Sequence, residues 1–269
     1  MVSIVLPRLI SFEGAPRRSA SVAERNVAAL KSAYWVVLIS GFFEPVLYLL
    51  SIGVGVGALV GDMTLPDGGV VSYAAFVAPA MLAASAMTGA LAETTFNFFG
   101  KMKYTKLYDG ILATPVQPFE IALGELGWAM ARGSLYSAAF LGVMVAMDLT
   151  SAARAIVAFP AAVLVGFAFG ALGMALSTFM RSWQDFDLMG SAQFTLFLFS
   201  GTFVPAEAYP SVLRWVVEVT PLYRSVELIR GITTSGGGLS QLVDLLYLIG
   251  VTALGLAIAS RRMGRLLCK

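Results

Sequence analysis

Long apolar runs recur along this chain, and several reach the length of about 20 residues that a helix needs to cross roughly 30 Å of hydrocarbon. Six spans can be placed, at residues 34–60, 73–96, 119–147, 155–179, 188–204 and 239–259. A membrane β-barrel would instead show alternating segments of about ten residues. The pattern therefore predicts an all-α integral membrane protein with both termini on one side.

A shorter amphipathic pattern precedes the first span. In SVAERNVAALKSAYW, one face of a helix holds apolar residues and the opposite face holds Arg25. The apolar face consists of Ala23, Val27, Leu30 and Tyr34. We expect this helix to lie along the headgroup layer; a cytoplasmic extension of the first span is the alternative. The predicted organisation is a tail with this helix at residues 1–33, a membrane domain at 34–260 and a second tail at 261–269.

The connection between the fifth and sixth spans stays apolar after the helix pattern breaks. In FSGTFVPAEAYP, Gly201 and Pro205 stop a helix, and two short helices can follow before the link TSGGG. Both have one apolar side and one charged side. Irregular backbone at membrane depth is tolerated only where protein or a water-filled cavity covers it. Residues 203–232 are therefore predicted to form short re-entrant helices in the outer leaflet.

Composition agrees with a membrane protein, because 58% of the residues are hydrophobic and only 13% are charged, too few charges to cover a soluble domain of this size. The basic residues are also unevenly distributed. Thirteen fall in segments on the predicted inner side and four on the outer side, with Arg132 inside a span. Since short loops rich in Lys and Arg remain in the cytoplasm, both termini are predicted to be cytoplasmic. The net charge is only +2, and no basic block suggests nucleic acid.

The sequence lacks residues that many catalytic and metal sites require. It has no histidine and a single cysteine, Cys268, which argues against a metal centre, a Ser-His-Asp site and an internal disulfide. It has no G-x-x-x-x-G-K-[ST] phosphate loop, so if ATP drives this protein, another chain binds it. No cofactor is expected on this chain. Gly53 and Gly57, like Gly166 and Gly170, have the four-residue spacing that lets helices approach closely.

Ionisable residues within or beside the spans are costly unless a partner or water compensates their charge. They are Glu44, Glu93, Glu120, Glu125 and Arg132. Glu44 precedes Pro45 in the first span, where it either lines a cavity facing substrate or a second protomer, or holds a kinked helix. Glu125 and Arg132 lie two turns apart on one helix face, too far apart for direct contact but directed at a common neighbour. Glu93, Glu120 and Glu125 are predicted near the cytoplasmic boundary, where either interfacial solvation or gating pairs would compensate their charge, rather than contact with substrate.

Three segments together resemble the ABC type-2 transporter permeases, the membrane subunits of exporters for drugs, lipids and polysaccharides. They are FSGTFVPAEAYP followed by PLYRSVELIRG, then GFFEPVLYLLSIGVGVG in the first span, and YDGILATPVQPFEIALGE entering the third. The last two look like the branch that contains nodulation protein J and daunorubicin-resistance permeases. The resemblance implies six helices per protomer, a dimer of permeases in the bacterial inner membrane, and two separate nucleotide-binding subunits that hold ATP and magnesium. One departure is Tyr223-Arg224 after the Pro-Leu pair, which places a charge near the exit.

By position, the resemblance implies three sets of site residues. A coupling helix within the loop at about 97–118 would contact the ATPase subunit through Lys101, Lys103, Lys106 and Tyr108. The translocation path or dimer interface would include Glu44, Pro45, Phe197 and Phe199. The extracellular gate would include Gly201, Phe203, Pro205, Glu227 and Arg230.

These features predict the permease subunit of an ATP-driven exporter, which forms half of a path for an amphipathic drug, lipid or polysaccharide. Its partners would be the ATPase subunits, a second permease protomer, identical or different, and membrane lipid. The alternative is an ion-coupled secondary transporter with Glu44 or Glu125 as proton carrier. A membrane scaffold that only recruits a soluble protein is a third class.

Overall fold

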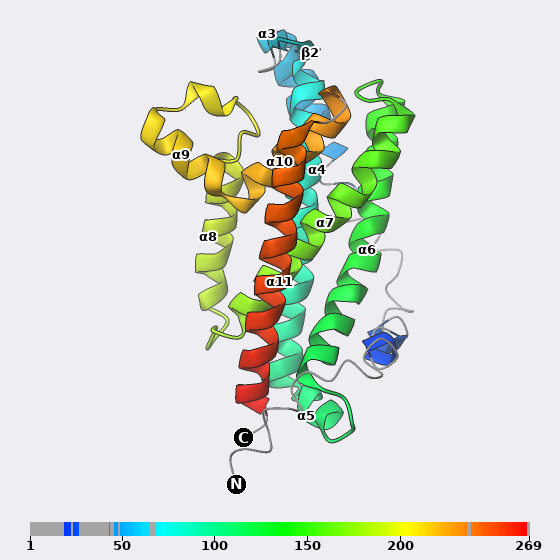
Figure 1. The fold of residues 1–269 in the computed structure, drawn as a ribbon, viewed down its shortest axis with the longest axis vertical. Helices are drawn as coiled ribbons and strands as arrows, with labels where there is room; N and C mark the ends of the chain where they lie inside the picture. Colours follow the sequence, from blue (N-terminus) through cyan, green and yellow to red (C-terminus); the bar gives the residue numbers. More distant parts are fainter. Residues whose placement is uncertain are drawn as a thin grey trace.

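The computed structural model describes residues 19–22, 24–26, 43, 46, 47, 49–64, 68–235 and 238–267. These residues are mostly helical. Four helical segments among them are long and apolar enough to cross a membrane, namely Tyr73–Lys103, Pro118–Ala146, Ala152–Ser177 and Leu239–Leu266. They run roughly along the long axis of the molecule (Figure 1). The described residues therefore contain the helices of a multi-pass membrane protein.

The first half of the described chain forms a short hairpin and then three of these long segments. It begins with η2 (Leu49–Val56), α3 (Gly57–Val60), β1 (Asp62–Thr64) and β2 (Val70–Ser72). Helix α4 (Tyr73–Ala92) continues through the π-helical stretches η3 (Glu93–Asn97) and η4 (Gly100–Tyr104). The short α5 (Leu107–Leu112) leads to α6 (Pro118–Ala146) and α7 (Ala152–Ser177). A capping box of Gln117 and Glu120, with Pro118 in the first position, fixes the start of α6.

The second half contains shorter helices followed by one long helix. They are α8 (Asp185–Leu198), η5 (Ala206–Ala208), α9 (Ser211–Val219), α10 (Pro221–Arg230), η6 (Gly231–Ser235) and α11 (Leu239–Leu267). The Thr220 hydroxyl accepts a hydrogen bond from the Tyr223 N–H and so caps α10. Two short helices between α8 and α11 are thus present where the sequence predicts them; their re-entrant position in a membrane stays a prediction.

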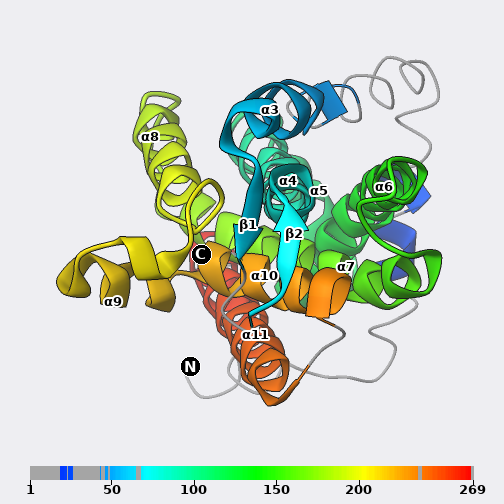
Figure 2. The ribbon, with the colours of Figure 1, turned by 90° about the horizontal axis from the view of Figure 1, so that it is seen from above.

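Helix α7 lies at the centre of the bundle, in contact with α4, α6, α10 and α11 (Figure 2). Glycines on α7 permit this close packing. A Cβ atom added to Gly166 would lie 2.9 Å from Met130 Sδ, and one added to Gly170 would lie 2.5 Å from Leu126 Cδ1, both on α6. The four-residue spacing of these glycines therefore marks a helix contact within the chain, as small residues do in membrane helix pairs.

Three predicted spans, at 119–147, 155–179 and 239–259, agree closely with α6, α7 and the first part of α11. Helix α11 continues to Leu267, so residues 261–267 extend this helix instead of forming a separate tail. The span predicted at 73–96 also continues, through η4 to Tyr104. Of the first predicted span, residues 43, 46, 47 and 49–60 are described, and the rest, including Glu44 and Pro45, lies outside the described residues.

The fifth predicted span, at 188–204, differs most from the structure. Helix α8 has 14 residues, a length of about 21 Å, and is shorter than a hydrocarbon layer of roughly 30 Å. It ends at Leu198, and the chain then turns at Gly201, whose φ of 68° is a conformation that favours glycine. The prediction of a helix up to residue 204 was therefore wrong, and the count of six spans stays a prediction.

A small antiparallel pair of strands was missed by the all-α prediction. Strands β1 and β2 pair with Met63 opposite Val71. The signal was present in the sequence, because β-branched Thr64, Val70 and Val71 flank the turn-forming residues Pro-Asp-Gly-Gly. The strand pair lies within the connection between α3 and α4 and does not alter the helical bundle.

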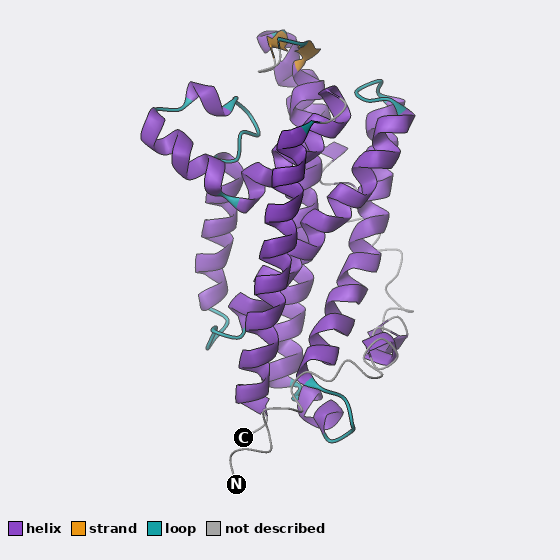
Figure 3. Cartoon of the chain, viewed as in Figure 1, coloured by secondary structure: helices purple, strands orange, loops and turns teal. Residues whose placement is uncertain are grey.

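The two ends of the bundle differ in the segments that they hold. Helix α5, the α7–α8 connection and the C-terminal part of α11 lie at one end, called the α5 end below (Figure 3). The β-hairpin and the α6–α7 connection lie at the opposite end, called the hairpin end. Segments assigned by charge to the same side of a membrane thus lie at the same end of the molecule. Which end faces the cytoplasm stays a prediction.

Candidate functional site

Arg230, the last residue of α10, connects three parts of the chain. Its side chain is buried; Nη2 donates a hydrogen bond to the Gly201 carbonyl at 2.8 Å and Nη1 forms an ion pair with Glu227 at 2.7 Å. Nε donates to the Phe76 carbonyl at 3.4 Å, and the guanidinium lies 4.0 Å from the centre of the Phe76 ring. We call Arg230, Glu227, Gly201 and Phe76 the Arg230 hub. Because guanidinium donors point in several fixed directions, one side chain joins α10, the segment after α8, and α4.

The segment after α8 makes further contacts near the hub. The Tyr73 hydroxyl of α4 donates to the Phe203 carbonyl at 3.5 Å. The Phe203 ring packs edge-on against Phe197 of α8, with ring centres 5.4 Å apart. A Cβ added to Gly201 would lie 3.3 Å from the Tyr223 ring of α10, so a larger residue has little room there. These contacts hold the irregular segment against α4 and α10.

Four of the predicted gate residues therefore lie in one region of the structure. Gly201, Glu227 and Arg230 are bonded to one another through Arg230, and Phe203 is packed beside them. Pro205, the fifth, follows in the same segment and precedes η5. Their function as a gate stays a prediction. Burial lowers the pKa of Arg230 and the Glu227 charge opposes this shift, and an arginine remains charged in proteins.

The residues predicted to form the translocation path or the dimer interface make fewer contacts with one another than the predicted gate residues do. Phe197 packs against Phe203, as described above, whereas Phe199 is 38% exposed and lies beside Tyr209, with ring centres 6.2 Å apart. Nothing in the described residues joins these two phenylalanines into one lining. Their assignment to a path or a dimer interface stays a prediction.

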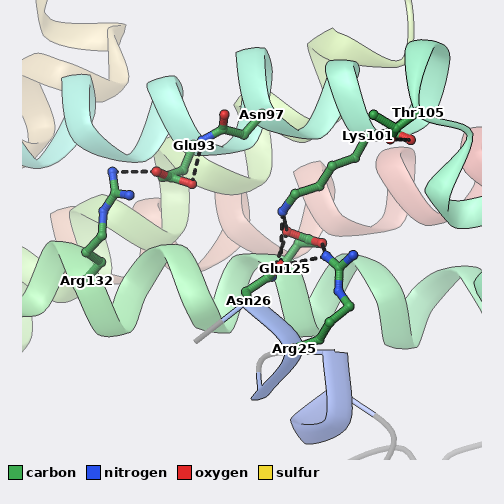
Figure 4. A network of polar contacts seen from close by, with 8 residues as sticks. All are labelled: Arg25, Asn26, Glu93, Asn97, Lys101, Thr105, Glu125 and Arg132. Atoms are coloured by element: carbon green, nitrogen blue, oxygen red, sulfur yellow. Dashed lines mark hydrogen bonds and ion pairs between the residues drawn. The ribbon is translucent and has the colours of Figure 1, made fainter. Parts of the chain in front are cut away.

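A second polar cluster surrounds Glu125 of α6 near the α5 end (Figure 4). The Glu125 carboxylate accepts hydrogen bonds from Lys101 at 2.6 Å, from Asn26 at 3.0 Å and from Arg25 at 3.3 Å. We call Arg25, Asn26, Lys101 and Glu125 the Glu125 cluster. Its side chains come from the N-terminal helical residues, from η4 and from α6, so it joins three segments that are distant in sequence.

Arg132, two turns further along α6, forms an ion pair with Glu93 of η3. Asn97 also donates to the Glu93 carboxylate, at 2.9 Å (Figure 4). Glu125 and Arg132 therefore face the same neighbouring helical segment, as their spacing predicted, but each has a different partner there. Glu93 and Glu125, two of the predicted boundary carboxylates, are thus paired with cations, and a role of these pairs in gating stays a prediction.

The predicted coupling residues divide into two kinds. Lys103 and Lys106 are exposed near the α5 end. Lys101 is engaged with Glu125, and Tyr108 has no exposed surface and packs against Phe98, with ring centres 5.2 Å apart. A soluble partner could therefore reach the first two directly, whereas Lys101 and Tyr108 can affect coupling only through the packing of α5 and η4.

Sequence reasoning missed Arg25 and Asn26 as partners of Glu125. The amphipathic pattern placed Arg25 on the solvent face, yet the side chains buried in this helix include Ser19, Val22 and Asn26. Glu125 itself was the signal in the sequence that could have predicted these contacts, because a carboxylate inside a span requires a partner that compensates its charge.

Arg224, identified from the sequence as a departure from the family pattern, forms an ion pair with Asp244 of α11 at 3.2 Å.

Comparison with known proteins places both clusters within one recognised region. A family model described as ABC-2 type transporter matches residues 21–234. Nodulation protein J of Rhizobium leguminosarum bv. trifolii is 35% identical over 213 residues, which cover 79% of each chain. Nodulation protein J of Sinorhizobium fredii is 32% identical over 234 residues, 86% of this chain and 87% of the relative. The inner membrane transport permease YadH of Escherichia coli is 31% identical over 112 residues, 41% of this chain and 40% of the relative.

Proposed function

This chain belongs to the ABC-2 type transporter family, and we propose that it is the membrane permease subunit of an ATP-driven exporter. The observation that carries the proposal is the family match across residues 21–234. The chain has no phosphate loop of its own, so the energy would come from ATP hydrolysis on a partner subunit. A second permease protomer would complete the path. The substrate class is an amphipathic drug, lipid or polysaccharide.

The mechanism that fits this proposal uses the two ends of the bundle. Closure of two ATPase subunits would displace α5 at the α5 end, and the long helices would transmit the movement. At the hairpin end, the segment after α8 would move away from α10 when the Arg230 hub opens, and close again when it reforms. The chain itself would break no covalent bond.

The proposal is tested by purifying the full chain from its native membrane. We expect it to retain a subunit that contains a phosphate loop and to show ATP hydrolysis only while that subunit is bound. The full chain separated from this subunit should have no ATPase activity. Hydrolysis by the separated chain, with contaminating ATPases excluded, would contradict the proposal.

Reversing two exposed charges at the α5 end should weaken binding of the ATPase subunit. The double variant Lys103→Glu, Lys106→Glu replaces attraction by repulsion if the partner surface is acidic, and we expect its affinity to fall by about tenfold or more. The matched control is Arg261→Glu, an exposed charge at the same end on α11. Binding is measured by titrating the purified ATPase subunit. Equal losses of affinity in both variants would show a non-specific charge effect. Lys103 and Lys106 would then not belong to the docking surface.

The alternative of an ion-coupled transporter needs a carboxylate that can take up and release a proton. In this structure Glu125 is already engaged, because three donors bind its two oxygens. Transport by the full chain in vesicles under a pH gradient, without ATP, would favour this alternative over the exporter.

A further inference from the structure

The Glu125 cluster contains more positive charge than negative charge. Arg25 and Lys101 share the single carboxylate of Glu125, and the Asn26 side-chain oxygen also accepts hydrogen bonds from both cations, at 2.6 Å and 3.2 Å. Glu125 Oε2 accepts from Lys101 and Asn26, and Oε1 accepts from Arg25. Two cations and one carboxylate leave a net charge of about +1 in a half-buried position, which is unfavourable unless an anion or water compensates it.

Unused hydrogen-bond donors lie at the same place. Among the described residues, the buried side-chain nitrogen and oxygen atoms without a hydrogen-bond partner are Ser19 Oγ, Arg25 Nε and Tyr108 Oη. Tyr108 is close enough to the cluster that, after burial itself, the Glu125 charge raises the pKa of its hydroxyl. Ser19 is held beside Glu125, because a Cβ on the adjacent Gly124 would lie 2.6 Å from the Ser19 carbonyl oxygen. Each atom can donate a hydrogen bond to an additional acceptor.

The position of the cluster indicates where that acceptor comes from. Glu125 lies seven residues after the start of α6 at Pro118, about 10 Å along the helix, and Lys101 lies near the end of Tyr73–Lys103, one of the segments long enough to cross the membrane. The cluster therefore lies at the depth of a lipid headgroup layer. The Arg25 side chain is 37% exposed and that of Lys101 is 23% exposed, so both cations are accessible from the surface.

We infer that the Glu125 cluster binds the phosphate of an anionic phospholipid headgroup, through Arg25, Lys101 and the Tyr108 hydroxyl. The phosphate supplies the missing negative charge and the missing acceptors, and charged donors bind phosphate strongly. Because Tyr108 belongs to α5, the lipid would link the headgroup layer to the helix beside the exposed Lys103 and Lys106. The inference concerns the lipid around the chain and does not depend on the proposed ATPase partner.

The test uses native mass spectrometry of the full purified chain, titrated with dioleoylphosphatidylglycerol or with dioleoylphosphatidylcholine. We expect phosphatidylglycerol to bind about tenfold more tightly than the zwitterionic lipid, because the choline cation of the latter offsets the phosphate charge next to Arg25 and Lys101. Inorganic phosphate should compete only at much higher concentration, because it lacks the acyl chains. If inorganic phosphate binds as tightly as the lipid, the ligand is a soluble phosphate and the lipid assignment is overturned.

Three variants locate the binding. Tyr108→Phe removes only the hydroxyl and should weaken phosphatidylglycerol binding by about threefold, and Arg25→Gln should weaken it by about tenfold. The control Arg261→Gln removes an exposed charge at the same end and should have no effect.

Arg25→Gln also loses its contact with Glu125 and could fail to fold, so Tyr108→Phe provides the independent test. Unchanged lipid binding in Tyr108→Phe, or an equal loss in Arg261→Gln, would overturn the inference. Loss of ATPase-subunit binding in Tyr108→Phe without loss of lipid binding would assign the site to a protein carboxylate instead.

Discussion

Replacing Arg230 with methionine is expected to lower the free energy of unfolding by about 3 kcal/mol and to leave the segment after α8 detached from α10. Methionine has a similar length but no donors, so the buried Gly201 carbonyl and the partly exposed Glu227 carboxylate lose their partner. An unpaired buried polar group costs far more than a hydrogen bond contributes. The change is measured by thermal unfolding of the purified chain in lipid nanodiscs.

Detachment of this segment can be detected separately from stability. With Cys268→Ser as background, Phe203→Cys provides a single thiol near the hub, and its reaction with a membrane-impermeant maleimide reports exposure. We expect faster labelling when Arg230→Lys is added, because one ammonium group keeps the charge but cannot reach three partners at once. The control is Arg214→Met on α9, where an exposed ion pair with Glu218 contributes little. Equal labelling rates in all three proteins would exclude the Arg230 hub as a latch.

The parts of the fold that the sequence predicted best are long, uniformly apolar and clearly bounded. Helices α6 and α7 begin where Pro118 and Ser151 mark a start, and the predicted spans agree within a few residues. The C-terminal end of α8 was predicted too far along the chain, because apolar residues continue past Leu198 although the chain already turns at Gly201. Hydropathy reports which residues avoid water; it does not report where an apolar segment stops being helical.

The candidate sites depend on contacts that no local pattern contains. Arg25 and Glu125 are 100 positions apart, and Arg230 and Phe76 are 154 positions apart. Spacing within one segment could predict that Glu125 needs a partner, but not which cation supplies it. In the N-terminal helix, contact with Glu125 places Asn26 on the buried side, whereas the predicted apolar face, Ala23, Val27, Leu30 and Tyr34, lies outside the described residues. The family resemblance named five gate residues, four of which the structure brings into one region, where reasoning from spacing alone had no means to do so; their function as a gate stays a prediction.

Substitution of Gly255 by leucine is expected to separate α7 from α11 and to lower the free energy of unfolding by about 3 kcal/mol. A Cβ at this position would lie 2.7 Å from the Ala171 carbonyl carbon and 2.9 Å from its oxygen. These are backbone atoms of the central helix, so no rotamer change can relieve the contact. Membrane helices associate largely through close van der Waals packing, and a lost fit is therefore not offset by a hydrophobic driving force.

The same helix offers a matched control, because a Cβ on Gly250 would meet no atom within 4 Å. Gly250→Leu adds the same side chain, with the same effect on the unfolded chain, and we expect no loss in thermal stability in nanodiscs.

Helix α11 also holds Asp244, the partner of Arg224 on α10. A shift of α11 in the Gly255 variant should therefore also shift α10, and labelling at the Phe203→Cys thiol should increase. If both glycine variants lose the same stability, a general effect of the added leucine side chain and not the α7–α11 contact explains the loss. If only Gly255→Leu is destabilised but labelling stays constant, the α7–α11 contact supports the bundle without positioning the Arg230 hub.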